Sequence, residues 1–222
     1  MLSFYTAMID FASARRKLVN SLKDEGVIKS DRVERAMLSV PREEFLPNYL
    51  RLYAYEDTPL QIMYDQTISA PHMVAIMCEL LDLKPGHRVL EIGTGTGYHA
   101  AVCAEAMERT GIVYTIEYYP GLALYAVQNL ARLGYLDMVH VIVGDGSRGL
   151  PDQAPFDRIL VTAAAPKVPP RLLDQLASNG IMVIPIEERL TQVLYVVTKE
   201  GDRPLMRPVT YVSFVKMKYS EE

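Results

Sequence analysis

Residues Val89 to Gly97 read Val-Leu-Glu-Ile-Gly-Thr-Gly-Thr-Gly, an apolar run that leads into a turn with three alternating glycines. Glycine leaves the backbone bare, so a bulky ligand can approach Gly93, Gly95 and Gly97 closely. Glu91 stands two residues before the first glycine and adds a carboxylate that suits a cationic group. The pattern therefore indicates a pocket for a bulky ligand with a positively charged end.

Two classes of cofactor are compatible with a glycine-rich turn after a strand. A dinucleotide site uses Gly-x-Gly-x-x-Gly, in which the third glycine lets a helix pack closely while its N-terminus faces a pyrophosphate. Tyr98 occupies that third position here. S-adenosylmethionine has no phosphate and has a cationic amino-acid end, so it suits the motif better. The remaining alternative, glycines that only turn the chain, is weaker because the motif directly follows a strand.

Two more acids follow predicted strands. Ile112 to Glu117 has the pattern of a buried strand and ends in Glu117, while Val139 to Val143 is followed by Gly144-Asp145-Gly146. In open parallel sheets ligands bind outside the carboxyl ends of the strands. Glu117 is therefore expected to accept hydrogen bonds from ribose hydroxyls, and Asp145 from an adenine amino group.

Alternating helical and strand patterns predict the elements that position these residues. Helices are expected over residues 4–23, 33–40, 71–81, 100–109, 122–133 and 171–178, and further strands over 157–162, 181–186, 192–199 and 209–215. The last two strands flank a predicted loop, residues 200–208, and have no helix between them, which indicates an antiparallel edge. The fold class is α/β: a Rossmann-like, mostly parallel sheet with an antiparallel edge. Residues 1–68 are expected to form a helical and irregular segment packed on a methyltransferase core of residues 69–222.

Composition sets further limits. The chain has 222 residues, of which 50% are hydrophobic, and a net charge of −4, which suits one compact unit with a substantial core. No long apolar run, basic signal region or Lys/Arg cluster occurs, so we expect a cytoplasmic protein without membrane or nucleic-acid partners. Cys78 and Cys103 lie in apolar helical patterns without metal-ligand spacing, which predicts buried, reduced thiols and no metal.

Five further segments are distinctive: Val40 to Phe45, Tyr55 to Asp57, Gln66 to Met73, Gly144 to Gly146 and Ala154 to Asp157. In these segments and in the glycine motif, the chain resembles the protein-L-isoaspartate (D-aspartate) O-methyltransferase family. The run Thr-Ile-Ser-Ala-Pro-His-Met from Thr67 is diagnostic, because other methyltransferases share the glycine motif but not this run. The resemblance extends from Val40 to about Leu194. Asp65 stands where the family usually has a glycine.

The resemblance implies methyl transfer from S-adenosyl-L-methionine to the free α-carboxylate of L-isoaspartyl, and by the family name D-aspartyl, residues in damaged proteins and peptides. The ester would initiate repair through a succinimide, with S-adenosyl-L-homocysteine as product and no metal. Ser69 would lie beside the transferred methyl as the catalytic residue, with Ile68 and Ala70 on the substrate. The implied cofactor-binding residues are Thr67, Glu91, Gly93, Thr94, Gly95, Thr96, Gly97, Glu117, Asp145 and Gly146.

Alternative roles remain open at this point. Ser69 could instead cap the helix that begins near Pro71. His72 invites a catalytic role, but an isoaspartyl α-carboxylate is already ionised at neutral pH and leaves no proton to remove. A methyltransferase for nucleic-acid amines would carry Asn/Asp-Pro-Pro-aromatic after the fourth strand, where this chain has residues 162–166, Thr-Ala-Ala-Ala-Pro. A non-enzymatic binding module would share the fold, and only methyl transfer to an isoaspartyl peptide separates it from an enzyme.

Overall fold

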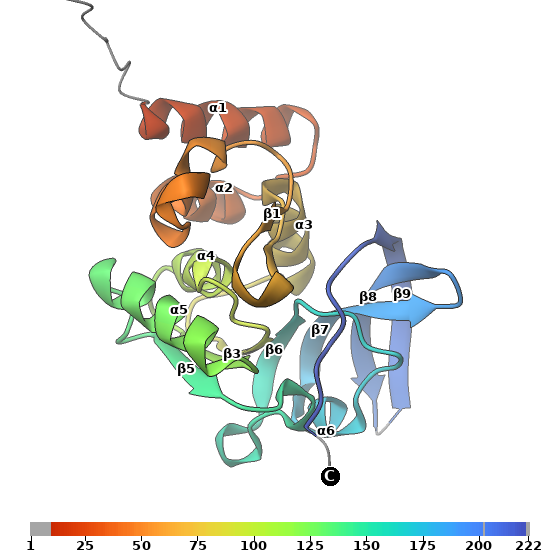
Figure 1. Cartoon of the computed structure of the whole chain (residues 1–222). Coiled ribbons are helices and arrows are strands. Elements are labelled where there is room, and N and C mark those ends of the chain that lie inside the picture. Colours follow the sequence, from red (N-terminus) through yellow and green to blue (C-terminus); the bar gives the residue numbers. More distant parts are fainter. Residues whose placement is uncertain (1–9, 202, 221–222) are drawn as a thin grey trace, which may run out of the picture.

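A seven-stranded sheet forms the centre of the computed structural model, which describes residues 10–201 and 203–220 (Figure 1). The strands are β3 (Arg88–Ile92), β4 (Ile112–Glu117), β5 (Val139–Val143), β6 (Phe156–Val161), β7 (Leu176–Glu188), β8 (Thr191–Glu200) and β9 (Arg203–Val212). Their order is β5-β4-β3-β6-β7-β8-β9. The first five run parallel, and β8 and β9 run antiparallel. The predicted α/β fold with an antiparallel edge is confirmed.

Helices cover both faces of this sheet. They are α3 (Pro71–Leu81), α4 (Tyr98–Ala106), α5 (Pro120–Arg132) and α6 (Pro170–Asp174). Successive residues of a strand point to opposite faces, so Val89 and Val113 join the core beneath α3, α4 and α5. Leu90 and Ile116 join a second core that includes residues of α6. The central strands β3, β4 and β6 are buried on both faces, as their apolar sequences predict.

Two N-terminal helices, α1 (Phe11–Asp24) and α2 (Asp31–Ser39), lie beyond α3 and α4 (Figure 1). Residues 4–9 of the predicted first helix lie outside the described residues. The second helix begins two residues earlier than predicted, because Ser30 is its N-cap and its hydroxyl accepts a hydrogen bond from the Val33 N–H at 3.2 Å.

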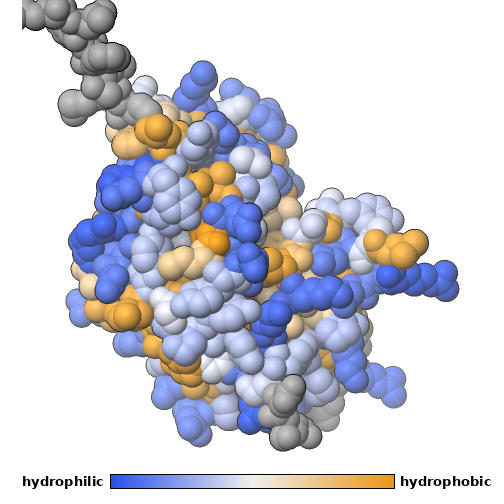
Figure 2. Space-filling model, in the orientation of Figure 1, coloured by the Kyte–Doolittle hydropathy of each residue, from blue (hydrophilic) through white to orange (hydrophobic). Residues whose placement is uncertain are grey.

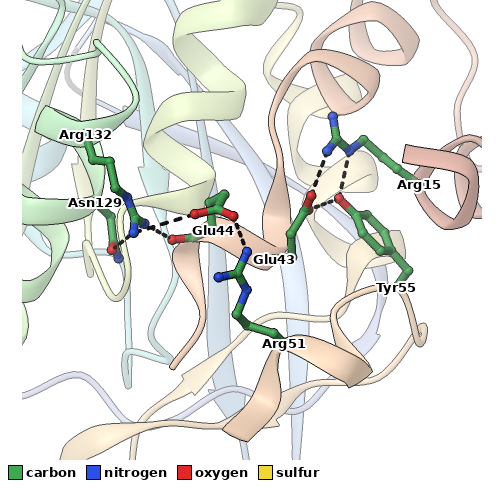
Figure 3. Close-up of polar contacts among 7 residues, drawn as sticks. All are labelled: Arg15, Glu43, Glu44, Arg51, Tyr55, Asn129 and Arg132. Atoms are coloured by element: carbon green, nitrogen blue, oxygen red, sulfur yellow. Dashed lines mark hydrogen bonds and ion pairs between the residues drawn. The ribbon is translucent and has the colours of Figure 1, made fainter. Parts of the chain in front are cut away.

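A polar network ties these helices to the core through a short 3-10 helix, Arg42–Phe45 (Figure 3). Arg15 of α1 donates to Glu43 at 3.0 Å and to the Tyr55 hydroxyl at 2.7 Å. The neighbouring Glu44 pairs with Arg51 and, at 3.6 Å, with Arg132 of α5. The segment Val40 to Phe45, which contributes to the family resemblance, therefore connects the N-terminal helices to the core.

The predictions for two segments were wrong. The helix predicted over 171–178 ends at Asp174, because β7 already begins at Leu176. The loop predicted over 200–208 is mostly strand: β8 and β9 are joined by a tight turn at Gly201, which has φ +59°. Pro204 and Pro208 suggested a loop, but β9 is an edge strand, where proline is tolerated because half of the backbone donors have no neighbour.

The irregular region 45–68 contains a small hairpin of β1 (Leu60–Gln61) and β2 (Thr67–Ile68). Tyr64 at its tip stacks on Tyr119, which directly precedes α5, with ring centroids 5.0 Å apart and planes 7° apart. A Cβ at Gly121 would overlap the Tyr64 hydroxyl, so this glycine makes room for the stack. The hairpin is thereby held against the carboxyl end of the sheet.

Replacing Asp65 with glycine should stabilise the chain. Asp65 has φ +56°, a left-handed conformation that costs a residue with a side chain about 1–2 kcal/mol. Glycine avoids this cost, but its greater conformational freedom in the unfolded state lowers the free energy of unfolding by about 0.4–1 kcal/mol. We expect a net gain of about 0.5–1 kcal/mol for Asp65→Gly, measured by chemical denaturation. Asp152→Gly is the control, because Asp152 lies in a 3-10 helix without positive φ and should lose stability. A loss at both positions would contradict the strain argument.

The face of the molecule in Figure 2 is mixed, with small apolar groups separated by polar residues. Among the described residues, no helix is both long and apolar enough to cross a bilayer.

Candidate active site

The glycine loop leaves β3 at the place where the strand order reverses, between β3 and β6, which is where open α/β sheets bind ligands. Gly93, Gly95 and Gly97 all have positive φ. A Cβ at Gly93 would overlap the hydroxyl of Thr162, which donates to the carbonyls of Ile92 and Gly93 at 2.9 and 2.8 Å. Gly93 is therefore required both by its backbone conformation and by the close approach of β6.

A narrow inner cavity of about 40 Å³ lies against this loop. It is lined by Thr67, Ile68, Ser69, Val74, Gly93, Thr94, Gly95, Thr96, Tyr98, His99 and Thr162. Thr96 Oγ1 and His99 Nδ1 are buried and have no hydrogen-bond partner within residues 10–201 and 203–220. Orphaned polar atoms beside bare backbone fit a polar ligand that satisfies them.

Glu117 ends β4 and faces a second cavity of about 40 Å³. Its two carboxylate oxygens accept hydrogen bonds from the Gly95 and Tyr119 N–H groups, each at 3.0 Å. A carboxylate has about four acceptor positions, so two remain for hydroxyl donors such as a ribose diol. Burial raises the pKa of Glu117, against the opposing effect of these backbone donors.

Glu91 lies beneath the glycine loop and lines neither cavity. It is fully buried and accepts a hydrogen bond from the Thr115 hydroxyl at 2.6 Å, and that hydroxyl lies 2.7 Å from the hydroxyl of Thr94. Burial raises the pKa of Glu91 to about 7. One oxygen of Glu91 thus contacts Thr115 and, through it, Thr94, while Oε1 has no hydrogen-bond partner among the described residues. Direct contact of Glu91 with a cationic ligand stays a prediction.

The C-terminal strap, which we define as residues 215–220, crosses the same edge of the sheet. The Met217 N–H donates to the Ala164 carbonyl at 2.8 Å, and the Ser220 N–H donates to Asp145 at 3.0 Å. Lys216, Met217 and Lys218 line the Glu117 cavity together with Gly146. Burial would raise the pKa of Asp145, but hydrogen bonds from Ser147 and Ser220 outweigh it and lower this pKa.

An outer cavity of about 390 Å³ adjoins the inner one. Its lining is mostly apolar: Pro59, Thr67, Ser69, Ala70, His72, Met73, Tyr211, Val212, Ser213 and Phe214. Thr67 and Ser69 line both cavities, so they form the wall between them. Ala70 lines the outer cavity and Ile68 lines the inner one. Their contact with substrate stays a prediction.

Ser69 does not cap α3. The N-cap position is Ala70, and no side chain makes a capping hydrogen bond there. This observation corrects the structural alternative for Ser69. His72 is held at its backbone N–H and at Nδ1 by Asp57, at 2.8 and 2.9 Å, which agrees with a structural role for its ring.

Several lining residues were not predicted, including Thr162, Tyr119 and the strap. Thr162 had a usable signal, since it follows the strand next to the glycine motif. The strap had none, because its position depends on backbone pairing with Ala164, which is remote in the sequence.

Comparisons with known proteins agree with this geometry. A family model for protein-L-isoaspartate(D-aspartate) O-methyltransferase matches residues 13–222. A protein-L-isoaspartate O-methyltransferase of Pyrobaculum arsenaticum is 58% identical over 203 residues, covering 91% of this chain and 99% of that protein. One from Hyperthermus butylicus is 59% identical over 215 residues, covering 93% and 89%.

Among solved structures, a putative protein-L-isoaspartate O-methyltransferase of Plasmodium falciparum in complex with S-adenosyl-L-homocysteine matches with a TM-score of 0.83 and 33% identity. The match covers 92% of this chain and 98% of that one. On the strength of the family model and these relatives, the chain belongs to the protein-L-isoaspartate(D-aspartate) O-methyltransferase family.

Proposed function

We propose that this chain transfers the methyl group of S-adenosyl-L-methionine to the free α-carboxylate of L-isoaspartyl residues in damaged proteins and peptides. The observation that carries the proposal is the wall of Thr67 and Ser69 shared by the two cavities. The glycine loop, the orphaned Thr96 hydroxyl and the open acceptors of Glu117 suit the cofactor on the inner side. The larger apolar cavity suits a peptide on the outer side.

The bound cofactor supplies an activated sulfonium methyl. The chain's residues then have mainly to orient and desolvate the nucleophile, since an α-carboxyl group with a pKa near 3.5 is ionised at neutral pH and needs no base. Correct alignment of oxygen, carbon and sulfur is worth on the order of 7–11 kcal/mol in favourable cases. Opposite charges meet and cancel in this reaction, so the apolar walls at Ile68 and Val74 favour it by excluding water.

Ser69 is the residue that we assign to the carboxylate. Ser69 lines both cavities, and its hydroxyl makes no hydrogen bond within the described part of the chain, so it is available to donate to a carboxylate oxygen. Metal chemistry has no part in this transfer, because the sulfonium is already electrophilic. We further propose a cytosolic location, because Cys78 and Cys103 are both buried and form no disulfide in this structure.

Ser69→Ala should lower the rate of methyl transfer at least tenfold, which corresponds to about 1.4 kcal/mol of transition-state stabilisation. Cofactor affinity and melting temperature should stay close to those of the unaltered protein, because Ser69 caps no helix. Turnover with an isoaspartyl peptide, calorimetry and thermal unfolding are measured on the same preparation. Ser178→Ala, on the exposed part of β7, is the matched control. Full turnover in Ser69→Ala would remove Ser69 from the reaction.

A further inference from the structure

Two cysteines and a histidine meet in the core behind the glycine loop. Cys78 lies on α3, while His99 and Cys103 lie one turn apart on α4. All three are buried. The Cys78 Sγ lies 3.4 Å from His99 Nε2, and the three ligand atoms all lie within 4.8 Å of one another. The sequence suggested no metal-ligand spacing, because it separates Cys78 from the other two.

We propose that Cys78, His99 and Cys103 form a binding site for one Zn²⁺ ion. Residues four apart on a helix lie on one face, so His99 and Cys103 both point toward α3. Tetrahedral zinc with Zn–S bonds near 2.3 Å and Zn–N bonds near 2.1 Å places its ligand atoms roughly 3.4–3.8 Å apart. The observed cluster is within a small side-chain adjustment of that geometry.

The charge of the ligands and a cavity beside Cys78 also suit a divalent ion. The two thiols release their protons to solvent on binding, and the two thiolates then neutralise Zn²⁺ while the imidazole stays neutral. Three protein ligands leave a fourth position for water. Cys78 also lines a cavity of about 370 Å³, whose charged lining residues are the three acids Asp31, Glu79 and Asp82 and the two arginines Arg32 and Arg35. The three acids outnumber the two arginines, so a cation can reach Cys78 through this cavity.

The site would be coupled to the inner cavity through His99. A metal on Nε2 fixes the ring proton on Nδ1, the buried atom that has no partner in the described chain. His99 itself lines the inner cavity, and α4 begins directly after the glycine loop. Zn²⁺ should therefore change cofactor affinity, and the cofactor should change Zn²⁺ affinity by the same factor. This coupling, unlike ion binding itself, rests on the proposed function.

Titration of the reduced full chain with Co²⁺ tests the site directly. The chain has two cysteines, so thiolate-to-Co²⁺ absorption reports on this cluster. We expect one Co²⁺ per chain with thiolate bands, displacement by Zn²⁺, and loss of these bands in the double variant Cys78→Ser/Cys103→Ser. His99→Gln should weaken Co²⁺ binding at least tenfold, whereas His140→Gln, on β5, is the control and should not.

The Co²⁺ titration of the unaltered protein tests the proposed metal site even if a variant fails to fold. Absence of thiolate bands from the reduced chain at excess Co²⁺ would overturn the proposal. Calorimetry of the cofactor with and without Zn²⁺ then measures the coupling. One bound ion without methyl transfer would leave the metal site standing and remove the proposed function. Methyl transfer without thiolate bands would leave the proposed function standing and remove the metal site.

Discussion

An isoaspartyl peptide should be methylated at least a hundred times faster, in kcat/KM, than the aspartyl peptide of the same sequence. In the isoaspartyl residue the carboxylate is attached directly to the main-chain Cα. In the aspartyl residue an additional methylene displaces it by about 1.5 Å. The wall at Thr67 and Ser69 fixes where a nucleophile must stand to reach the inner cavity, and a misplacement of about 1 Å can cost on the order of a hundredfold in rate.

Transfer of labelled methyl groups to the two matched peptides measures this ratio. A third peptide, with the isoaspartyl α-carboxylate converted to an amide, is the control and should accept no methyl group. Equal rates on the isoaspartyl and aspartyl peptides would mean that the outer cavity does not position its substrate as proposed.

Glu117→Gln should weaken S-adenosyl-L-methionine binding by more than a hundredfold. Glutamine removes the charge and replaces one acceptor oxygen with an NH2 donor, so neither ribose hydroxyl keeps a charged acceptor. Hydrogen bonds to a charged acceptor contribute roughly 1.5–3 kcal/mol each, and each 1.4 kcal/mol is a tenfold change in affinity. The carboxylate also orders the Gly95 and Tyr119 N–H groups, so the glycine loop should loosen as well.

Titration calorimetry of the cofactor checks this expectation, with Glu34→Gln on the surface of α2 as the matched control. The unaltered protein should give no heat with NADH, because Tyr98 stands at the third glycine position of a dinucleotide site. Retained affinity in Glu117→Gln, or tight NADH binding, would contradict the assignment of this pocket.

The sequence predicted two neighbouring strands with the correct bounds. Ile112–Glu117 and Val139–Val143 both agree with the structure, because each is rich in β-branched residues and has a glycine at one end. Periodicity failed at the end of α6, where an apolar stretch at Leu176 fits helix and strand equally well. It failed again at β9, because local signals from Pro204 and Pro208 cannot reveal that a strand lies at an edge.

Some features of the candidate site could be predicted from the sequence, and others could not. Glu117, Asp145 and the glycine loop could be predicted, because the carboxyl ends of parallel strands always meet at one edge. The burial of Glu91 away from both cavities could not be predicted, since it depends on the hydroxyls of Thr94 and Thr115. The meeting of Cys78 with His99 likewise depends on how α3 packs against α4, which no spacing in the sequence encodes.

The C-terminal strap and the cofactor are expected to compete for the same hydrogen-bond acceptor, Asp145. Asp145 offers its oxygens to Ser147 and Ser220, and the Ser220 amide occupies an acceptor position that the amino group of adenine would use. With the predicted adenine contact at Asp145, arrival of the cofactor would exchange one hydrogen bond for another, and the free energy of opening the strap would be subtracted from the binding free energy. The same subtraction applies to the spent cofactor, whose adenosine half is identical. The strap would therefore lower both affinities by the same factor, which favours release of the spent cofactor without changing its affinity relative to that of the fresh cofactor.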